Sequence, residues 1–261
     1  MRKLALITGA SAGIGAEFAR LYAERGMDLV LTARREDRLT SLASELRDAF
    51  GVDVDVLPAD LSLPASPKQL IDELEQRKRH VDILINNAGY GLPGTFLETK
   101  WEDQRDFLQV MLTAPAELCH LTLPGMVERG FGRIINVASL AGLTPGSKGH
   151  TLYGPVKAAL IRASESLNAE VLGTGVHVTA LCPGLTRSEF HDVNGQRARL
   201  SRVPEFMWQS AEDVVEAAWY ANEANRPVIV TGGVNKLLAA AAQVLPGPVA
   251  RAVMREQAKR I

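Results

Sequence analysis

The chain has 261 residues, of which 46% are hydrophobic and 23% are charged, and its formal net charge is −1. These proportions are typical of a globular protein, and the near-zero net charge argues against a general affinity for nucleic acids or acidic membranes. The two cysteines, Cys119 and Cys182, and the five scattered histidines make no metal-binding motif, and so few cysteines favour a reduced, cytoplasmic protein over a disulfide-bonded one.

Short apolar runs alternate with longer segments of helical periodicity along the chain. Uninterrupted apolar runs predict strands that are buried on both faces, here at residues 3–8, 28–33, 52–59, 81–86, 133–138, 176–181 and 228–231. The helical pattern covers about residues 14–25, 36–49, 65–79, 101–129, 153–173 and 211–224. This alternation predicts an α/β, Rossmann-like, doubly wound sheet of seven parallel strands, flanked by helices and joined by right-handed crossovers.

The rest of the chain predicts no further domain. No composition break divides it, so we expect a single domain over residues 1–261. No run reaches the ~18 consecutive apolar residues of a membrane-spanning helix. The tail at about residues 234–261 is alanine-rich and apolar and ends in a basic stretch. It predicts a helical extension that caps a pocket, joins an interface or touches a membrane surface.

A glycine-rich turn, TGASAGIG, follows the first predicted strand at residues 8–15. Gly9, Gly13 and Gly15 let a diphosphate approach the main chain closely. The helix that starts near Ile14 presents free N–H groups and the positive end of its dipole to such an anion. Because the turn lies directly after the first strand of a βαβ pattern, a dinucleotide site is favoured over a plain glycine turn.

The end of the second predicted strand indicates which dinucleotide is bound. Proteins that bind NAD usually place an acidic residue there, to accept a hydrogen bond from the adenosine ribose. This chain has Ala33, Arg34 and Arg35 instead, and arginine holds a 2′-phosphate by charge-assisted hydrogen bonds. The pattern therefore favours NADP(H), with Ser11 of the glycine turn as a further phosphate ligand. The alternative is that both arginines are solvated and selectivity is weak.

Tyr153 and Lys157 stand four residues apart in a helical segment, so both side chains lie on one helix face. Such pairs are common on ordinary helix surfaces and identify nothing alone. Together with TGASAGIG, NNAG at residues 86–89, Ser139 in NVASLAG, YGPVK at 153–157 and PG at 183–184, however, the chain resembles the short-chain dehydrogenase/reductase family, of the single-domain, tyrosine-dependent type. The resemblance runs from residue 3 to about residue 232.

The resemblance implies a role for each matching position. The catalytic residues would be Ser139, Tyr153 and Lys157. The expected cofactor-binding residues are Gly9, Ser11, Gly13, Ile14, Gly15, Arg34, Arg35, Asp60, Leu61, Asn86, Ala88, Gly89, Tyr153, Lys157, Pro183, Gly184, Thr186 and Ser188.

The same resemblance places these residues along the cofactor. Asp60 and Leu61 would lie by the adenine, and residues 86, 88 and 89 would support the ribose and the central strand. Pro183 and Gly184 would face the nicotinamide, with Thr186 near its carboxamide. Ser188 stands where the family often has threonine and keeps the hydroxyl that can reach the diphosphate.

The implied chemistry is an NADP(H)-dependent hydride transfer between the nicotinamide and a carbonyl or secondary alcohol. The phenol of Tyr153 has an ordinary pKa near ~10, and the nearby ammonium of Lys157 would lower it. Ser139 would hydrogen-bond the carbonyl oxygen, and Tyr153 would protonate that oxygen during reduction. The alternative function is a catalytically weakened or silent NADP-binding sensor or scaffold protein.

One position departs from the family pattern. The family often has an asparagine in the helix before the fifth strand, where it holds a water that links the lysine to solvent, and this chain has Met111. A thioether cannot replace the amide as a hydrogen-bond partner. Either main chain alone holds the water, or proton relay is slower, or catalysis is lost while cofactor binding is kept. Because the three catalytic residues are retained, we favour the first two alternatives.

The substrate lid is expected at about residues 187–210, which contain four arginines (187, 197, 199 and 202) among large apolar residues. One hypothesis is therefore an apolar substrate with an acidic end. The alternative is that these arginines are solvated and the aromatic residues only pin the lid. Tyr90 and His150 are further candidates for the pocket. The family resemblance also implies a homodimer or homotetramer, formed through the helices at about 101–129 and 153–173.

Overall fold

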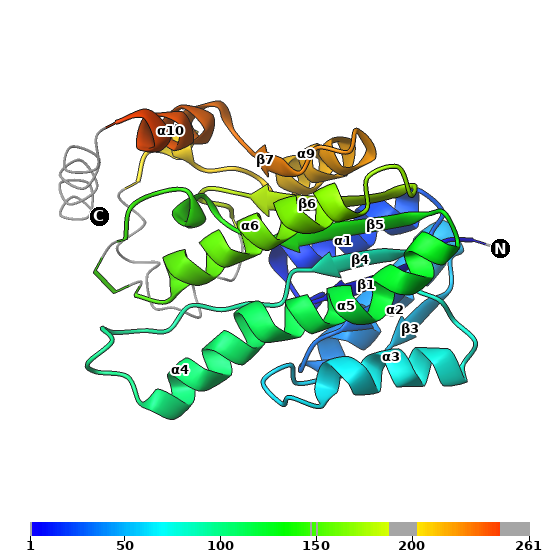
Figure 1. Cartoon of the computed structure of the whole chain (residues 1–261). Coiled ribbons are helices and arrows are strands. Elements are labelled where there is room, and N and C mark those ends of the chain that lie inside the picture. The colour runs from blue at the N-terminus through cyan, green and yellow to red at the C-terminus, as the bar shows by residue number, and fades with distance from the viewer. Residues whose placement is uncertain (1, 147, 150, 188–202, 246–261) are drawn as a thin grey trace.

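Seven parallel strands form one sheet in the order β3-β2-β1-β4-β5-β6-β7 (Figure 1). The computed structural model describes residues 2–146, 148–149, 151–187 and 203–245. The strands are β1 Leu4–Thr8, β2 Asp28–Thr32, β3 Val54–Val56, β4 Ile83–Asn86, β5 Gly132–Val137, β6 Val176–Cys182 and β7 Val228–Val230. The predicted doubly wound parallel sheet is therefore confirmed, and its strand order reverses direction between β1 and β4.

Helices cover both faces of this sheet (Figure 1). One face carries α1, α2 and α9, and the other carries α3, α5 and α6. The helices are α1 Gly13–Glu24, α2 Glu36–Phe50, α3 Ser66–Gln76, α4 Trp101–Leu108, α5 Ala114–Glu128, α6 Tyr153–Glu170, α9 Ala211–Glu223 and α10 Gly233–Val244. Three short helical turns, η1 Gln109–Thr113, η2 Leu140–Gly142 and η3 Glu205–Met207, complete the described elements.

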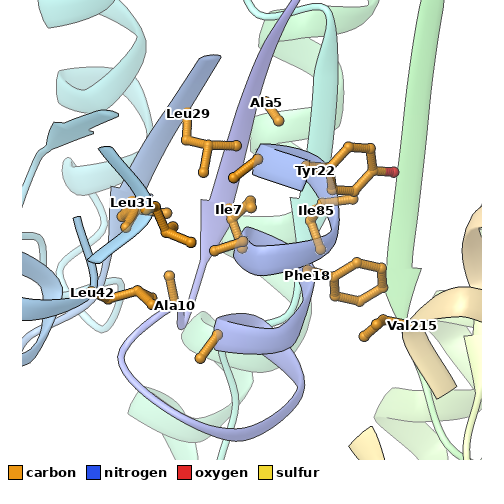
Figure 2. Packing of buried hydrophobic residues seen from close by; sticks show 14 of the residues in the cluster. Ala5, Ile7, Ala10, Phe18, Tyr22, Leu29, Leu31, Leu42, Ile85 and Val215 are labelled. Atoms are coloured by element: carbon orange, nitrogen blue, oxygen red, sulfur yellow. The ribbon is translucent and has the colours of Figure 1, made fainter. Parts of the chain in front are cut away.

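Burial on both faces explains why the strands are apolar without interruption. Side chains of a strand point alternately to opposite faces, so in β1 Leu4 and Leu6 pack under α3 and α5 while Ile7 packs under α1. Figure 2 shows the second of these layers, in which Ile7 of the sheet lies beside Phe18 and Tyr22 of α1. Both aromatic side chains are almost fully buried, so α1 is fixed rigidly on the strand that precedes the glycine turn.

The third strand is shorter than the residues 52–59 predicted for it, although hydrogen bonds to the neighbouring segment continue past its end. The amide N–H groups of Leu57 and Ala59 still donate to Leu31 and Ala33 of the neighbouring chain segment, at 3.0 and 3.1 Å. Pro58 between them has no N–H group and is tolerated because β3 is an edge strand. The chain therefore continues alongside β2 as far as the predicted adenine-binding residues.

The long helix predicted at residues 101–129 is interrupted by the π-helical turn η1. Pro115 explains the interruption, because it lacks the N–H group that would bond the carbonyl of Met111 in a regular α-helix. By length and composition alone, Trp101–Glu128 is apolar enough to cross a membrane. It buries Leu118 and Met126 in the core beneath the sheet, as a core helix does.

Two segments lie partly outside the described residues. The predicted tail contains α10, as expected of a helical extension, and residues 246–261 are not described. Of the lid, residues 188–202 are not described, and these include Ser188, Arg197, Arg199 and Arg202. The described return of the lid carries η3, whose Phe206 side chain is 72% exposed and so does not pin the lid to the core.

The packing in Figure 2 leads to a stability prediction for Phe18, which has no exposed surface. We expect Phe18→Ala to lower the free energy of unfolding by about 3–5 kcal/mol, because it removes buried contacts and leaves a cavity. Phe206→Ala is the matched control and should change it by less than about 0.5 kcal/mol. Urea denaturation followed by circular dichroism measures both; equal effects of the two variants would contradict this account of the core.

Candidate active site

The candidate site lies at the carboxyl ends of β1 and β4, where the strand order reverses and where α/β sheets bind ligands. The hydroxyl of Thr8 joins the two strand ends. It donates to the carbonyl of Ile85 at 3.2 Å and accepts from the amide N–H groups of Asn87 and Ala88 at 2.9 and 3.0 Å. One buried side chain thereby holds the glycine turn and the NNAG segment side by side.

The glycine turn is packed too closely for larger residues. A Cβ on Gly15 would lie 2.3 Å from the carbonyl oxygen of Gly9, and a Cβ on Gly9 would lie 2.8 Å from the Cα of Ala88. Gly9 also has a φ of +67°, which favours glycine. The side-chain amide of Asn87 donates to the carbonyls of Thr8 and Gly9 at 3.0 and 3.2 Å. Sequence reasoning missed Asn87, although it is the second asparagine of NNAG.

The N-terminus of α1 is well suited to an anion. Ala12 is its N-cap and makes no side-chain capping hydrogen bond, and the first turn contains no acidic residue. The first N–H groups of the helix therefore have no partner within it, and their dipole favours a negative ligand. Gly13 and Ile14 lie in this first turn, as predicted. The close glycine packing and this uncapped helix end together fit a dinucleotide diphosphate.

The predicted phosphate-binding residues come together at the end of β2. Nε and Nη2 of Arg35 donate to the hydroxyl oxygen of Ser11 at 3.3 and 3.0 Å. The side chains of Arg34 and Arg35 are exposed beside the half-buried Ala33. This group of two guanidiniums and one hydroxyl fits a phosphate on an adenosine ribose. Position 33 adds no acidic side chain that would repel the phosphate.

The side chains of the residues predicted near the adenine and ribose mostly make contacts within the protein itself. Asn86 is 3% exposed, and its amide donates to Asn136 of β5 at 2.8 Å and to the carbonyl of Pro115 at 3.2 Å. Leu61 is buried in the core, while the carboxylate of Asp60 accepts from the amide of Ser62 at 3.0 Å. Asn86 thus supports the central strands as expected, and the predicted adenine contacts stay predictions.

The predicted catalytic residues are brought together from β5, η2 and α6. Tyr153 begins α6 and Lys157 follows one turn later, with its Nζ 5.8 Å from the centre of the Tyr153 ring. Lys157 is 5% exposed, and its Nζ donates to the carbonyl of Val137 at 2.7 Å. Ser139 caps η2 by accepting from the amide of Ala141 at 3.1 Å, and its hydroxyl lies close enough to Tyr153 to lower the pKa of the phenol.

A close backbone contact fixes the serine segment to the catalytic helix. A Cβ on Gly142 would lie 2.7 Å from the main-chain nitrogen of Ala158 and from the carbonyl carbon of Lys157. Only glycine therefore allows η2 to approach α6 this closely. Sequence reasoning did not single out Gly142, although it follows Ser139 in the NVASLAG motif.

Burial disfavours the charged form of both titratable catalytic residues. It raises the pKa of Tyr153, and the hydrogen bond with Ser139 opposes this only in part. It also lowers the pKa of Lys157 to about 8. Burial is thus the larger influence on the phenol in the protein by itself, and the expectation that Lys157, aided by the oxidised nicotinamide, lowers the pKa of Tyr153 stays a prediction. The phenol stays protonated at neutral pH, and the lysine charge is lost in mildly alkaline solution.

The PG segment follows β6 and lies against the catalytic residues. The carbonyl of Pro183 accepts from the amide of Leu140 at 2.9 Å, which links the segment to the residue after Ser139. The hydroxyl of Thr186 donates to the carbonyl of Gly184 at 3.2 Å, so it closes a local turn. Ser188 lies outside the described residues.

A pocket that is partly open to solvent lies beside Tyr153, between the chain after β4 and the start of α6. Its described lining is uncharged and combines apolar side chains with hydroxyls and one amide: Leu92, Thr95, Phe96, Thr99, Gln104, Phe107, Thr151 and Leu152, with glycines between them. Tyr90 packs edge-to-face on Phe107, with ring centres 5.6 Å apart, and so supports this wall from behind. His150 lies outside the described residues.

Met111 is buried behind this pocket and is 1% exposed. It packs with Phe107 of α4 and Val156 of α6. Its sulfur would lie 2.8 Å from a Cβ on Gly89, so the thioether fills the space beside the NNAG segment. Met111 therefore makes an apolar layer under the catalytic helix at the position where the family often has an amide.

Comparison with known proteins identifies the family. A family model described as short chain dehydrogenase matches residues 3–198. The chain belongs to the short-chain dehydrogenase/reductase family. It is 36% identical over 225 residues to sulfoacetaldehyde reductase 2 of Chromohalobacter salexigens, covering 84% of this chain and 88% of that protein.

Solved structures of this family have the same fold. A short-chain dehydrogenase from Sphingobium yanoikuyae in complex with NADPH matches with a TM-score of 0.80 and 36% identity over 87% of each chain. A short-chain dehydrogenase/reductase from Burkholderia phymatum in complex with NAD matches with a TM-score of 0.80 and 28% identity, covering 91% of this chain and 92% of that one. Both nicotinamide dinucleotides therefore occur among the structural neighbours.

The apolar surroundings of Met111 lead to a two-part prediction for this short-chain dehydrogenase/reductase. We expect Met111→Asn to retain or raise turnover per folded molecule, because it restores an amide at the family position. The same change should lower the free energy of unfolding by about 1–3 kcal/mol, because the amide is buried among apolar groups. Met111→Leu, which conserves volume, is the control. A sharp loss of turnover in a folded Met111→Asn protein would contradict the prediction.

Proposed function

We propose that this protein is an NADP(H)-dependent oxidoreductase that transfers a hydride between the nicotinamide and a carbonyl or secondary alcohol. The observation that carries the proposal is the convergence of Ser139, Tyr153 and Lys157 at the same edge of the sheet as the glycine turn. The Nζ of Lys157 donates to the carbonyl of Val137 of β5 at 2.7 Å and lies 5.8 Å from the centre of the Tyr153 ring. Membership in an oxidoreductase family, with neighbours in complex with NADPH or NAD, supports it.

The catalytic residues divide the work of carbonyl reduction. The hydroxyls of Ser139 and Tyr153 lie near each other, so a substrate carbonyl oxygen can be held between two hydroxyl donors. Bound NADPH supplies the hydride to the carbonyl carbon. Tyr153 gives its phenolic proton to the oxygen as negative charge develops there. Burial keeps this phenol protonated beforehand, and the ammonium of Lys157 stabilises the phenolate that remains.

The phosphate end of the site favours NADP(H) over NAD(H). Arg35 and Ser11 are already in contact, so a 2′-phosphate meets preorganised donors rather than separate, mobile side chains. Residue 33 at the end of β2 is alanine, so this position has no carboxylate to accept a hydrogen bond from an unmodified ribose. The complex of the Sphingobium relative with NADPH supports this preference.

The described pocket favours a neutral carbonyl compound with an apolar body. No charged side chain lies in its described lining, and burying a carboxylate without a cationic partner is costly. Of the lid arginines, Arg187 is described, and it forms an ion pair with Glu205. Both side chains are exposed, at 59% and 80%. The acidic-substrate hypothesis now rests on arginines outside the described residues and on the name of the sulfoacetaldehyde reductase relative.

Turnover of a carbonyl panel tests the proposed reaction. We expect the protein to oxidise NADPH in the presence of aryl and alkyl ketones faster than with oxo acids of matched size. Tyr153→Phe should lower kcat about 10²–10⁴-fold, because it removes the proton donor. Tyr220→Phe, in a 57% exposed tyrosine of α9, is the matched control and should leave kcat unchanged.

The possible results of this panel have different meanings. Faster reduction of the oxo acids would reject the hypothesis of a neutral substrate but would still support a reductase. Tight NADPH binding without turnover of any carbonyl would favour a catalytically silent NADP-binding protein.

Fluorescence titration with NADPH and NADH tests the cofactor preference. We expect the wild-type protein to bind NADPH more tightly. Arg35→Ala should weaken NADPH binding about 10–100-fold with little effect on NADH, because one charge-assisted contact to the 2′-phosphate is lost. Arg226→Ala removes an exposed arginine from the turn that precedes β7, at the opposite edge of the sheet, and should change neither affinity. Equal wild-type affinities would mean that the arginines face solvent.

A further inference from the structure

Asn235 of α10 packs directly against Gly184 of the PG segment. A Cβ on Gly184 would lie 2.3 Å from Nδ2, 2.5 Å from Cγ and 2.5 Å from Oδ1 of Asn235. The whole amide therefore lies on the Cα of this glycine. Asn235 is 5% exposed, and sequence reasoning assigned it no role. The absence of a side chain at residue 184 is therefore required for this contact with α10.

Two further polar side chains complete a frame around the PG segment. Asn235 donates to the carbonyl of Thr231 at 2.9 Å, and its Nδ2 lies 3.1 Å from the amide group of Gln209. The hydroxyl of Thr231 lies 2.8 Å from the same amide group. These three side chains come from α10, the end of β7 and the return of the lid, and we call them the polar frame.

The polar frame is connected to the PG segment through the main chain as well. The main-chain N–H of Gln209 donates to the carbonyl of Leu185 at 2.9 Å. The main-chain carbonyl of Gln209 accepts from the main-chain N–H of Arg187 at 3.0 Å. Residues 184–187 are thereby held between Asn235 on one side and a strand-like pairing with Gln209 on the other. Thr231 adds a bond from its amide to the carbonyl of Cys182 at 3.4 Å.

The pattern of buried and exposed residues in α10 indicates that the contact between Asn235 and Gly184 is more than ordinary packing. The helix buries the amide of Asn235 while Leu237 and Val244 are 74% and 83% exposed. An asparagine is a poor choice for filling a buried space, because every polar atom needs a partner. A local departure from the apolar-inside pattern is expected where a residue serves a functional site.

We propose that Asn235 is a positioning residue for the nicotinamide-binding segment. By fixing Gly184 and Leu185, the polar frame sets the depth at which the nicotinamide lies over the substrate carbonyl carbon. Hydride transfer is sensitive to such placement, because a displacement of about 1 Å costs about 10²-fold in rate. The inference rests on the proposed function and assigns α10 and the return of the lid a part in it.

A comparison of the whole cofactor with a fragment tests this role. We expect Asn235→Ala to lower kcat for NADPH-dependent reduction about 10–100-fold and to weaken NADP⁺ binding. Binding of 2′-phospho-ADP-ribose, which lacks the nicotinamide, should stay unchanged, and so should the preference for NADPH over NADH. Lys236→Ala, in an exposed residue next along α10, is the matched control. The binding comparison needs no substrate and so applies even without turnover.

A compensating pair of substitutions separates positioning from general stability. Gly184→Ala alone should abolish most turnover, because its Cβ collides with Asn235. The double variant Gly184→Ala/Asn235→Ala frees that space and should regain at least about 10-fold of the lost kcat. Gln209→Ala removes the Gln209 side chain from the polar frame but leaves Asn235 packed on Gly184. It should lower kcat and NADP⁺ affinity as Asn235→Ala does. It also serves as the second test if Asn235→Ala does not fold.

Clear results would overturn the inference. It fails if folded Asn235→Ala has wild-type kcat and NADP⁺ affinity, if the fragment loses as much affinity as NADP⁺, or if the double variant is no better than Gly184→Ala. A wild-type protein that binds neither NADPH nor NADH would instead refute the proposed function. The two failures are therefore distinguishable before any variant is made.

Discussion

The junction of β1 and β4 is the constraint on which the rest of this structure depends. A parallel sheet whose strand order reverses leaves a gap between the two crossover connections at that point. Here the hydroxyl of Thr8 closes the junction by bonding the ends of both strands. The glycine turn, the NNAG segment and the uncapped start of α1 then take their positions from it. The side-chain amide of Asn87 strengthens the same junction by donating to the carbonyls of Thr8 and Gly9.

Close backbone contacts set the geometry around that junction. Gly15 approaches Gly9, Gly142 approaches the α6 backbone, and Gly184 approaches Asn235, each at a distance that a Cβ would prevent. Each contact fixes one part of the site: the phosphate turn, the catalytic serine segment or the expected nicotinamide-binding segment. The first two are contacts between main chains and the third is with a side chain, so the site is positioned largely by the surrounding scaffold.

Burial is the main electrostatic influence on the catalytic pair. It raises the pKa of Tyr153 and lowers that of Lys157. Burial therefore favours the neutral phenol of Tyr153 and the neutral amine of Lys157. The apolar layer made by Met111, Phe107 and Val156 contributes to this dry environment. Such a site suits a proton donor, since the phenol is protonated before a carbonyl arrives. A cation at Lys157 becomes most valuable once the phenolate has formed.

The amino-acid sequence by itself determined the features that depend on local pattern. Buried parallel strands are apolar without interruption, so their number and type were readable, and the glycine turn, Ser139, Tyr153 and Lys157 stood in motifs of fixed spacing. The π-turn at Met111 escaped prediction because it depends on a single proline, and the predicted ends of β3 lay too far apart. Only the tertiary structure decided which distant side chains meet. Asn235 lies on Gly184, Arg187 pairs with Glu205, and Asn87 holds the glycine turn. Such contacts join segments far apart in the chain and leave no periodic signal, because they follow from how the packed elements bring those segments together.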